Sequence, residues 1–209
     1  MGTEVKKCAI ISGAPESDLS YYKKYLYDRY IICADSGYRK CNLLKITPGL
    51  IIGDFDSSPK PNVNCEIIEL KVRKDDTDTF HCVKEAIDRG YNDIVILGGI
   101  GSRIDHTYSN ILSVNFCFER NIKCALINEK NMITVVSGEA VIKKGEYEHF
   151  SLFALFEKCT GLSISGSQYD LDNVELDPFS QLTQSNAFKK DEVKIEIKSG
   201  KIILILSND

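Results

Sequence analysis

The chain has 209 residues, 43% of them hydrophobic and 27% charged, with a net charge of −4 at pH 7. This is the composition of a globular chain long enough for one large domain or two modest ones. Because no block of like charges occurs and no apolar run reaches the length of a membrane span, we expect neither nucleic acid nor membrane as a partner.

Eight cysteines are spread along the chain. No two of them form a C-x-x-C pair, so a zinc site is not indicated. The amino-terminal sequence MGTEVKKCAII lacks the apolar core of a secretion signal. We therefore expect reduced, mostly buried thiols and a cytoplasmic protein.

Short apolar runs alternate with helical patterns in the first part of the chain. The sequence predicts a strand over 8–11 that ends in the turn SGAP, a helix over 17–29, and a second strand, YIICA, over 30–34. A helix over 38–45 and a third strand over 50–53 follow. This alternation is typical of a doubly wound, mostly parallel sheet.

Carboxylates follow the second and third predicted strands, each time beside a glycine. Asp35 lies in ADSG, and Asp54 and Asp56 flank Phe55 in GDFD. Ligands of open α/β sheets bind beyond the carboxyl ends of the strands, and carboxylate oxygens are ligands that Mg²⁺ prefers. The repetition favours a shared acidic cleft that binds metal over the alternative, a solvated acidic turn.

A strand over 65–70 precedes the acidic segment KDDTDTFHCVKEAIDRG, residues 74–90. Thr77 or Asp78 is expected to cap a helix that Gly90 ends. Favourable interaction with the helix dipole is an alternative explanation for the aspartates.

The fifth predicted strand runs into GGIGSRIDH, with glycines at 98, 99 and 101. These glycines let the backbone approach a ligand, and the start of the following helix, over 106–120, favours phosphate. The segment has neither the Walker pattern nor a G-x-G-x-x-G at a first βα turn.

From about residue 132 the pattern changes to period-two alternation with glycine turns, as in ITVVSG, AVIKKG, HFSLFALF, LSISGSQYDL, EVKIEIKSG and KIILILS. Such alternation predicts antiparallel β structure. We therefore expect an α/β domain over 1–129 and a small antiparallel β-sandwich domain over 130–209.

The motifs in chain order are ADSG at 34–37, GDFDSS at 53–58, KDDTDT at 74–79, GGIGSRIDH at 98–106 and SNAF at 185–188. Together they resemble the thiamine pyrophosphokinase (thiamine diphosphokinase) family over nearly the whole chain. The resemblance implies transfer of a pyrophosphoryl group from ATP to the hydroxyl of thiamine, giving thiamine diphosphate and AMP, with Mg²⁺. It implies that 1–129 binds ATP and Mg²⁺, and that 130–209 binds thiamine and mediates dimerisation.

The resemblance also assigns roles to single residues. The catalytic residues would be Asp54, Asp56, Asp78 and Asp105, the first three also holding the metal. The nucleotide contacts would be Asp35, Gly99, Gly101, Arg103, Asp105 and His106, although a helical histidine without a neighbouring metal ligand is more often structural. The thiamine contacts would be Thr77, Tyr169, Ser185 and Asn186.

Ser185 and Asn186 are expected to reach the vitamin from the partner subunit of a homodimer whose interface holds thiamine. For Tyr169, a place in the core or at the edge of the sandwich is an equal alternative to stacking on thiamine. Ser36 and Ser102 depart from the family pattern, which has glycine at both positions.

Two other functions fit parts of the sequence. The run from Asp54 to Ser58 matches the D-x-D-x-[TS] motif of haloacid-dehalogenase-like phosphatases and phosphotransferases, in which Asp54 would be the nucleophile. That reading leaves GGIGSRIDH and the β domain unexplained. A non-catalytic regulator that binds thiamine or a nucleotide would be favoured by loss of an acidic ligand, and no matched aspartate is missing. We therefore predict an active enzyme.

Overall fold

The computed structural model describes residues 4–56, 60–73, 75–101 and 103–209. The chain divides into two compact units, Met1–Glu129 (unit 1) and Lys130–Asp209 (unit 2). Ser57, Ser58, Lys74 and Ser102, which belong to the predicted motifs, lie outside the described residues. Within those residues, no helix is long and apolar enough to cross a membrane.

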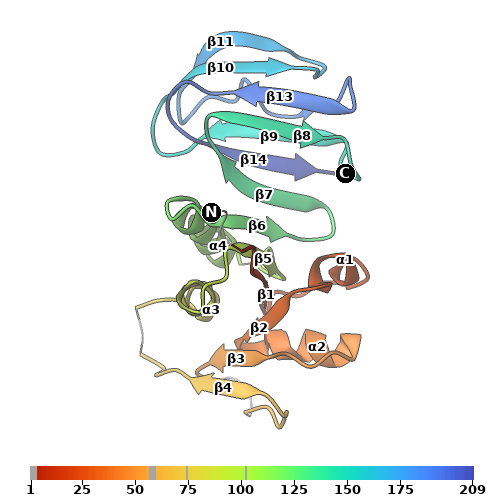
Figure 1. Cartoon of the computed structure of the whole chain (residues 1–209), viewed down its shortest axis with the longest axis vertical. Helices are drawn as coiled ribbons and strands as arrows, with labels where there is room; N and C mark the ends of the chain where they lie inside the picture. Colours follow the sequence, from red (N-terminus) through yellow and green to blue (C-terminus); the bar gives the residue numbers. More distant parts are fainter. Residues whose placement is uncertain (1–3, 57–59, 74, 102) are drawn as a thin grey trace. The chain divides into compact units, whose positions relative to one another are not determined.

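Unit 1 contains parallel strands in the order β4-β3-β2-β1-β5-β6 (Figure 1). These strands are β1 (Lys7–Ile11), β2 (Tyr30–Ala34), β3 (Leu50–Gly53), β4 (Glu66–Glu69), β5 (Asp93–Leu97) and β6 (Lys123–Ile127). Every residue of β3 and β5 is buried, as expected for parallel strands covered on both faces. The predicted doubly wound, mostly parallel sheet is confirmed.

The helices of unit 1 are α1 (Tyr22–Leu26), α2 (Tyr38–Leu44), α3 (Asp78–Asp88) and α4 (Ile104–Phe118), and a 3-10 turn, η1 (Asp35–Gly37), follows β2. In Figure 1, α1 and α2 lie on one side of the parallel strands and α3 and α4 on the other. The helix predicted over 17–29 is too long. The Asp18 carboxylate accepts the N–H of Ser20 at 2.7 Å and forms a local turn, and Tyr27 is already extended.

Unit 2 is built from two layers of antiparallel strands, in the orders β12-β9-β14-β7 and β11-β10-β13-β8. The strands are β7 (Asn131–Val136), β8 (Glu139–Lys143), β9 (His149–Ala154), β10 (Cys159–Ser165), β11 (Leu171–Leu176), β12 (Asn186–Ala187), β13 (Glu192–Glu196) and β14 (Ile202–Ser207). Alternate residues of both layers enter one core, for example Phe150 and Leu204 from the first and Leu162 and Ile195 from the second. The predicted antiparallel sandwich is confirmed.

Strand β1 is the point at which the order of unit 1 reverses. It has β2 on one side and β5 on the other, because the chain builds β2, β3 and β4 outward before α3 returns it to β5. In open α/β sheets such a switch point opens a crevice at the carboxyl ends of the flanking strands.

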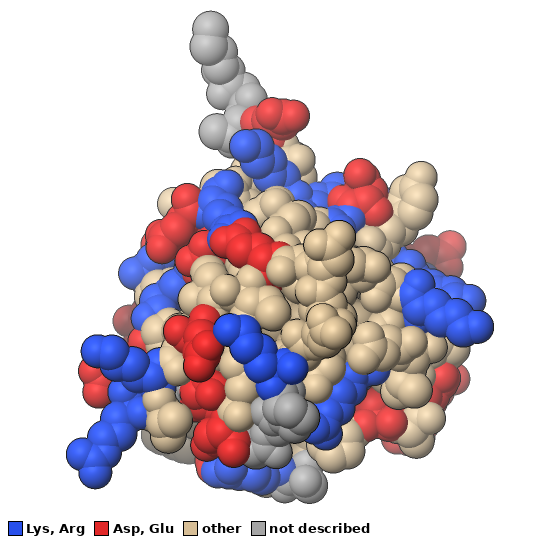
Figure 2. Space-filling model, turned by 90° about the horizontal axis from the view of Figure 1, so that it is seen from below, with Lys and Arg blue, Asp and Glu red and all other residues tan. Residues whose placement is uncertain are grey.

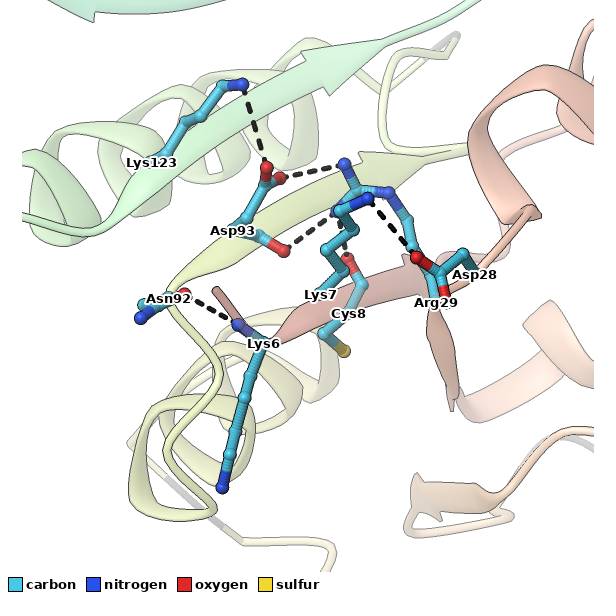
Figure 3. A network of polar contacts seen from close by, with 8 residues as sticks. All are labelled: Lys6, Lys7, Cys8, Asp28, Arg29, Asn92, Asp93 and Lys123. Carbon is cyan, nitrogen blue, oxygen red and sulfur yellow. Dashed lines mark hydrogen bonds and ion pairs between the residues drawn. The ribbon is translucent and has the colours of Figure 1, made fainter. Parts of the chain in front are cut away.

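A network of charges joins the strands of unit 1 at the opposite, amino-terminal edge (Figure 3). Arg29, just before β2, pairs with Asp93 of β5 at 2.8 Å and donates to the carbonyl oxygens of Cys8 at 3.2 Å and Asp93 at 2.8 Å. Lys123 of β6 lies 3.6 Å from the same carboxylate. The side chains of Arg29 and Asp93 are only 13% and 11% exposed, so their charges depend on each other.

Charged side chains elsewhere on the surface are mixed. Figure 2 shows a face on which Lys and Arg are interspersed with Asp and Glu, and neither sign covers it.

We predict that Asp93→Asn lowers the free energy of unfolding by about 2–4 kcal/mol, because it leaves the Arg29 guanidinium partly buried without a counter-ion. Glu69→Gln, which breaks the exposed pair with Lys60, is the matched control and should cost at most about 0.5 kcal/mol. Urea unfolding followed by far-UV circular dichroism measures both. Equal, small losses would show that the network adds nothing to stability.

Candidate active site

A cavity of about 540 Å³ opens at the switch point, where β1, β2, β3 and β5 end and α3 and α4 begin. Most of the residues predicted for the site in unit 1 line it: Asp35, Asp54, Asp56, Thr77, Asp78, Gly99, Gly101, Arg103 and His106. Asp105 is not among the described residues that line it.

Two strand ends bring the carboxylates together. A side chain on Gly53 would place its Cβ 3.0 Å from the Cα of Asp35, so the absence of one lets the end of β3 lie against the end of β2. Asp35 (φ 42°) and Phe55 (φ 51°) are both left-handed, a conformation that is costly for residues other than glycine and common at functional sites. The backbone N–H of Asp56 donates to Asp54 Oδ1 at 3.3 Å.

The amino-terminal turn of α3 forms another wall. Thr77 is its N-cap and accepts the N–H of Phe80 at 3.2 Å, and Asp78 lies in the first turn. The hydroxyl groups of Thr79 and Ser12 are buried and 2.7 Å apart, which ties α3 to the loop that follows β1. Because its hydroxyl accepts the N–H of Phe80, Thr77 has a structural role as the N-cap of α3.

The glycine-rich turn after β5 packs closely against that loop. Gly98 has φ +65°, and a Cβ there would lie 2.5 Å from the carbonyl oxygen of Ser12. Buried Asn110 donates to the carbonyl of Gly99 at 2.8 Å, and the N–H of Gly101 donates to Thr107 at 3.2 Å. The turn is held in place by side chains of α4.

Arg103, the N-cap residue of α4, pairs with Asp105 at 2.5 Å, and both side chains are exposed. The guanidinium holds the pKa of the Asp105 carboxyl below its usual value, and the carboxylate raises the pKa of Arg103. Asp105 also accepts the N–H of His106 at 3.0 Å. The geometry makes Asp105 a partner of Arg103, and the catalytic and nucleotide-contact roles that the family resemblance implies for Asp105 stay predictions.

The acidic residues fit an ion that brings further ligands with it. Among the described residues, Asp35 Oδ1 is buried without a hydrogen-bond partner, which suits a carboxylate awaiting a cation or a donor. No group of three or more His, Cys, Asp or Glu in the described chain is arranged to hold a metal alone. Because Mg²⁺ often takes one or two carboxylates plus phosphate oxygens, one or two carboxylates among Asp54, Asp56 and Asp78 fit a metal carried by a phosphorylated ligand.

In unit 2, the amide of Asn186 is fully used within the protein. Its Oδ1 accepts the N–H groups of Tyr169 at 3.1 Å and Ala187 at 2.9 Å, and its Nδ2 donates to Tyr169 O at 2.9 Å and Ser167 Oγ at 3.3 Å. An amide can make only these four bonds. Within the protein, this amide holds the backbone at Tyr169, and the contact of Asn186 with thiamine stays a prediction.

Tyr169 and Ser185 are placed differently from Asn186. Asn186 is 3% exposed, whereas Tyr169, whose backbone it holds, is 62% exposed. This excludes the core alternative for Tyr169. Ser185 is left-handed (φ 54°), and its N–H donates to Ser151 Oγ at 2.9 Å.

Sequence reasoning missed the wall formed by Ser12, Gly13, Ala14 and Pro15, and also Thr79 and Asn110. The available signal was the SGAP turn directly after the first strand. Its importance depends on the strand order, which places β1 between β2 and β5.

Comparison with known proteins finds matches in both units. The family model described as thiamin pyrophosphokinase, catalytic domain, matches residues 22–126, and the one described as thiamin pyrophosphokinase, vitamin B1 binding domain, matches 139–202. The thiamine pyrophosphokinase of Bacillus subtilis is 28% identical over 214 residues, covering 98% of this chain and 100% of the relative.

Solved structures agree with these matches. The crystal structure of the B. subtilis protein superposes with a TM-score of 0.90 at 26% identity, covering 98% of this chain and all of that one. A thiamin pyrophosphokinase structure from Geobacillus thermodenitrificans, at 22% identity and a TM-score of 0.86, covers 97% of each chain and shares the fold.

We predict that Gly98→Ala destabilises the protein by about 2–4 kcal/mol, through a left-handed alanine and a clash with Ser12. Gly138→Ala is the matched control. Its φ of +64° is nearly the same, but a Cβ there meets nothing within 4 Å, so its cost should be about 1 kcal/mol. Thermal and urea unfolding of the two variants measure the difference. Equal costs would mean that the close approach at Gly98 is not a constraint.

Proposed function

Because the chain belongs to the thiamine pyrophosphokinase family, and is thereby an enzyme of the transferase kind, we propose that it transfers a pyrophosphoryl group from ATP to the hydroxyl of thiamine. The products are thiamine diphosphate and AMP. The observation that supports this most is the cavity at the switch point, which gathers Asp35, Asp54, Asp56 and Asp78 with Arg103 beside a glycine-rich turn.

In the proposed reaction the hydroxyl oxygen of thiamine forms a bond to the β-phosphorus of ATP. The bond from that phosphorus to the α–β bridging oxygen breaks, and AMP leaves with the oxygen. A carboxylate of the cavity takes the hydroxyl proton. Transfer of this kind depends on positioning and on neutralising the charge of the phosphoryl oxygens.

The residues of unit 1 divide these tasks. Arg103 offers phosphate a planar fork of donors, and Asp105 orients it from the solvent side. Asp54, Asp56 and Asp78 would hold Mg²⁺, which when bound neutralises phosphate oxygens. Asp35, Gly99, Gly101 and His106 line the same cavity and would border the nucleotide, with Thr77 near thiamine.

For unit 2 we propose thiamine binding through the ring of Tyr169 and through Ser185, in a homodimer whose interface holds the vitamin. The match of residues 139–202 to a vitamin B1 binding domain supports the first part. Unit 1 then serves as the domain that binds ATP and Mg²⁺. The described cysteines are all free thiols, which is consistent with the cytoplasm as the proposed location.

Neither alternative function is favoured. A dehalogenase-like phosphatase would use Asp54 as a nucleophile, but the family matches cover both units and include a vitamin-binding domain. A non-catalytic regulator does not require four aspartates lining one cavity.

The reaction can be tested with purified protein, ATP, Mg²⁺ and thiamine. We expect AMP and thiamine diphosphate in equal amounts, and neither after chelation of the metal. Asp54→Asn should lower kcat/KM by about a thousandfold. Asp76→Asn, in the acidic segment before α3 and paired with Lys84, is the control and should stay near wild type. Formation of ADP and thiamine monophosphate would mean that a single phosphoryl group is transferred, which contradicts the proposed reaction. Release of inorganic phosphate in the absence of thiamine would support the phosphatase alternative.

A double-mutant cycle tests the roles of Tyr169 and Asn186. We expect Tyr169→Ala and Asn186→Ala each to raise KM for thiamine about fivefold to tenfold, because one removes the ring and the other its support. The double variant should be no worse than the poorer single variant, since both act through the same contact. Multiplied losses would instead mean that Asn186 touches the vitamin directly.

A further inference from the structure

A buried ion pair lies beside the cavity, among residues to which the proposed reaction gives no role. Lys40 of α2 and Glu16, in the loop after β1, are 2.6 Å apart, and their side chains are only 10% and 9% exposed. Glu16 Oε2 also accepts the hydroxyl of Tyr22 at 2.6 Å, and Oε1 accepts that of Tyr21. One carboxylate thus connects α1, α2 and the loop.

The pair is not explained by stability alone. Removing two charges from water costs several kcal/mol per ion, and apolar replacements of similar volume are often as stable. Burial lowers the pKa of Lys40, against the opposing effect of Glu16, and raises the pKa of Tyr22. Such groups are best attested where they specify one conformation.

The conformation specified here is that of a cavity wall. Glu16 directly follows Ser12–Pro15, which line the cavity. A Cβ on Gly98, across the cavity wall, would lie 2.1 Å from Lys40 Nζ and 2.9 Å from the Tyr22 hydroxyl, so the ion pair packs directly behind Gly98. The loop and the glycine turn are also joined, because the N–H of Ala14 donates to the carbonyl of Gly98 at 3.0 Å.

We infer that Glu16, with Lys40 as its buried counter-ion, is a positioning residue for ATP: it holds the wall Ser12–Pro15 against the glycine turn and so sets nucleotide affinity. This rests on the proposed function. The nucleotide is the substrate concerned because the wall adjoins Gly98–Gly101 and the start of α4, a helix of fifteen residues whose amino terminus favours phosphate. Neither residue of the pair is among the described residues that line the cavity, so the inference gives the pair no role in the chemistry.

The test measures ATP binding in the presence of Mg²⁺ by calorimetry, and KM for each substrate with kcat. Glu16→Gln and Lys40→Met each leave one buried charge uncompensated and loosen the wall. We expect Kd and KM for ATP to rise about tenfold, with kcat and KM for thiamine within about threefold of wild type. Lys40→Arg keeps the cation and should recover most of the affinity. Glu69→Gln, in an exposed pair of the same unit, is the control.

The outcomes separate this inference from the proposed function. Thermal unfolding shows which variants are folded. If Lys40→Met does not fold, Lys40→Arg, which keeps the cation, is compared with wild type in its place. Folded Glu16→Gln with wild-type affinity for ATP would overturn the inference while leaving the function intact. Equal losses for ATP and thiamine, or a fall in kcat alone, would also overturn it. Wild-type protein that does not bind ATP would contradict the proposed function, and the inference with it.

Discussion

The close approach of backbone segments around the end of β1 is the constraint on which the site depends. A Cβ at Gly37 would lie 2.0 Å from the carbonyl oxygen of Ile11, and one at Gly98 would lie 2.5 Å from that of Ser12. Only glycine allows such contact. Asp35 is the first residue of the turn that contains Gly37, and Gly99 directly follows Gly98. The two glycines that let neighbouring strand ends approach each other are therefore next to residues that line the cavity. The position of the acidic site is therefore set first by the packing of the backbone.

The net negative charge of the side chains that line the cavity limits which ligands it can bind. Four aspartates line it, and Arg103 is the one arginine among the described lining residues. An anionic nucleotide would be repelled by these carboxylates unless cations accompany its phosphates. On the proposed function, the cavity is complementary to a metal–nucleotide complex and not to either component alone.

Much of the fold, and the acidic side of the cavity, could be predicted because both depend on local patterns. Uninterrupted apolar runs identify the parallel strands, and Asp35, Asp54 and Asp56 simply follow two of them. The rest depends on contacts between distant segments. The wall Ser12–Pro15 matters only because β1 lies between β2 and β5, and the position of Glu16 beside Lys40 follows from the packing of α2. Asn186 stands in a motif that suggests ligand contact, yet three of the four hydrogen bonds of its amide go to Ser167 and Tyr169, in a distant turn.

The two ends of the parallel strands differ in how well their polar groups are satisfied. At the amino-terminal ends of the strands, Arg29 pairs with Asp93 and donates to two backbone carbonyl groups, so that loss of either partner would leave a buried charge unpaired. At the carboxyl edge, Asp35 and Phe55 adopt left-handed conformations and Asp35 Oδ1 is buried without a partner among the described residues, features that cost free energy. Strain of this kind persists only when the surrounding structure holds it in place. Backbone pairing keeps β1, β2 and β5 in register, so their carboxyl ends are held in the unfavourable geometry that a ligand can relieve.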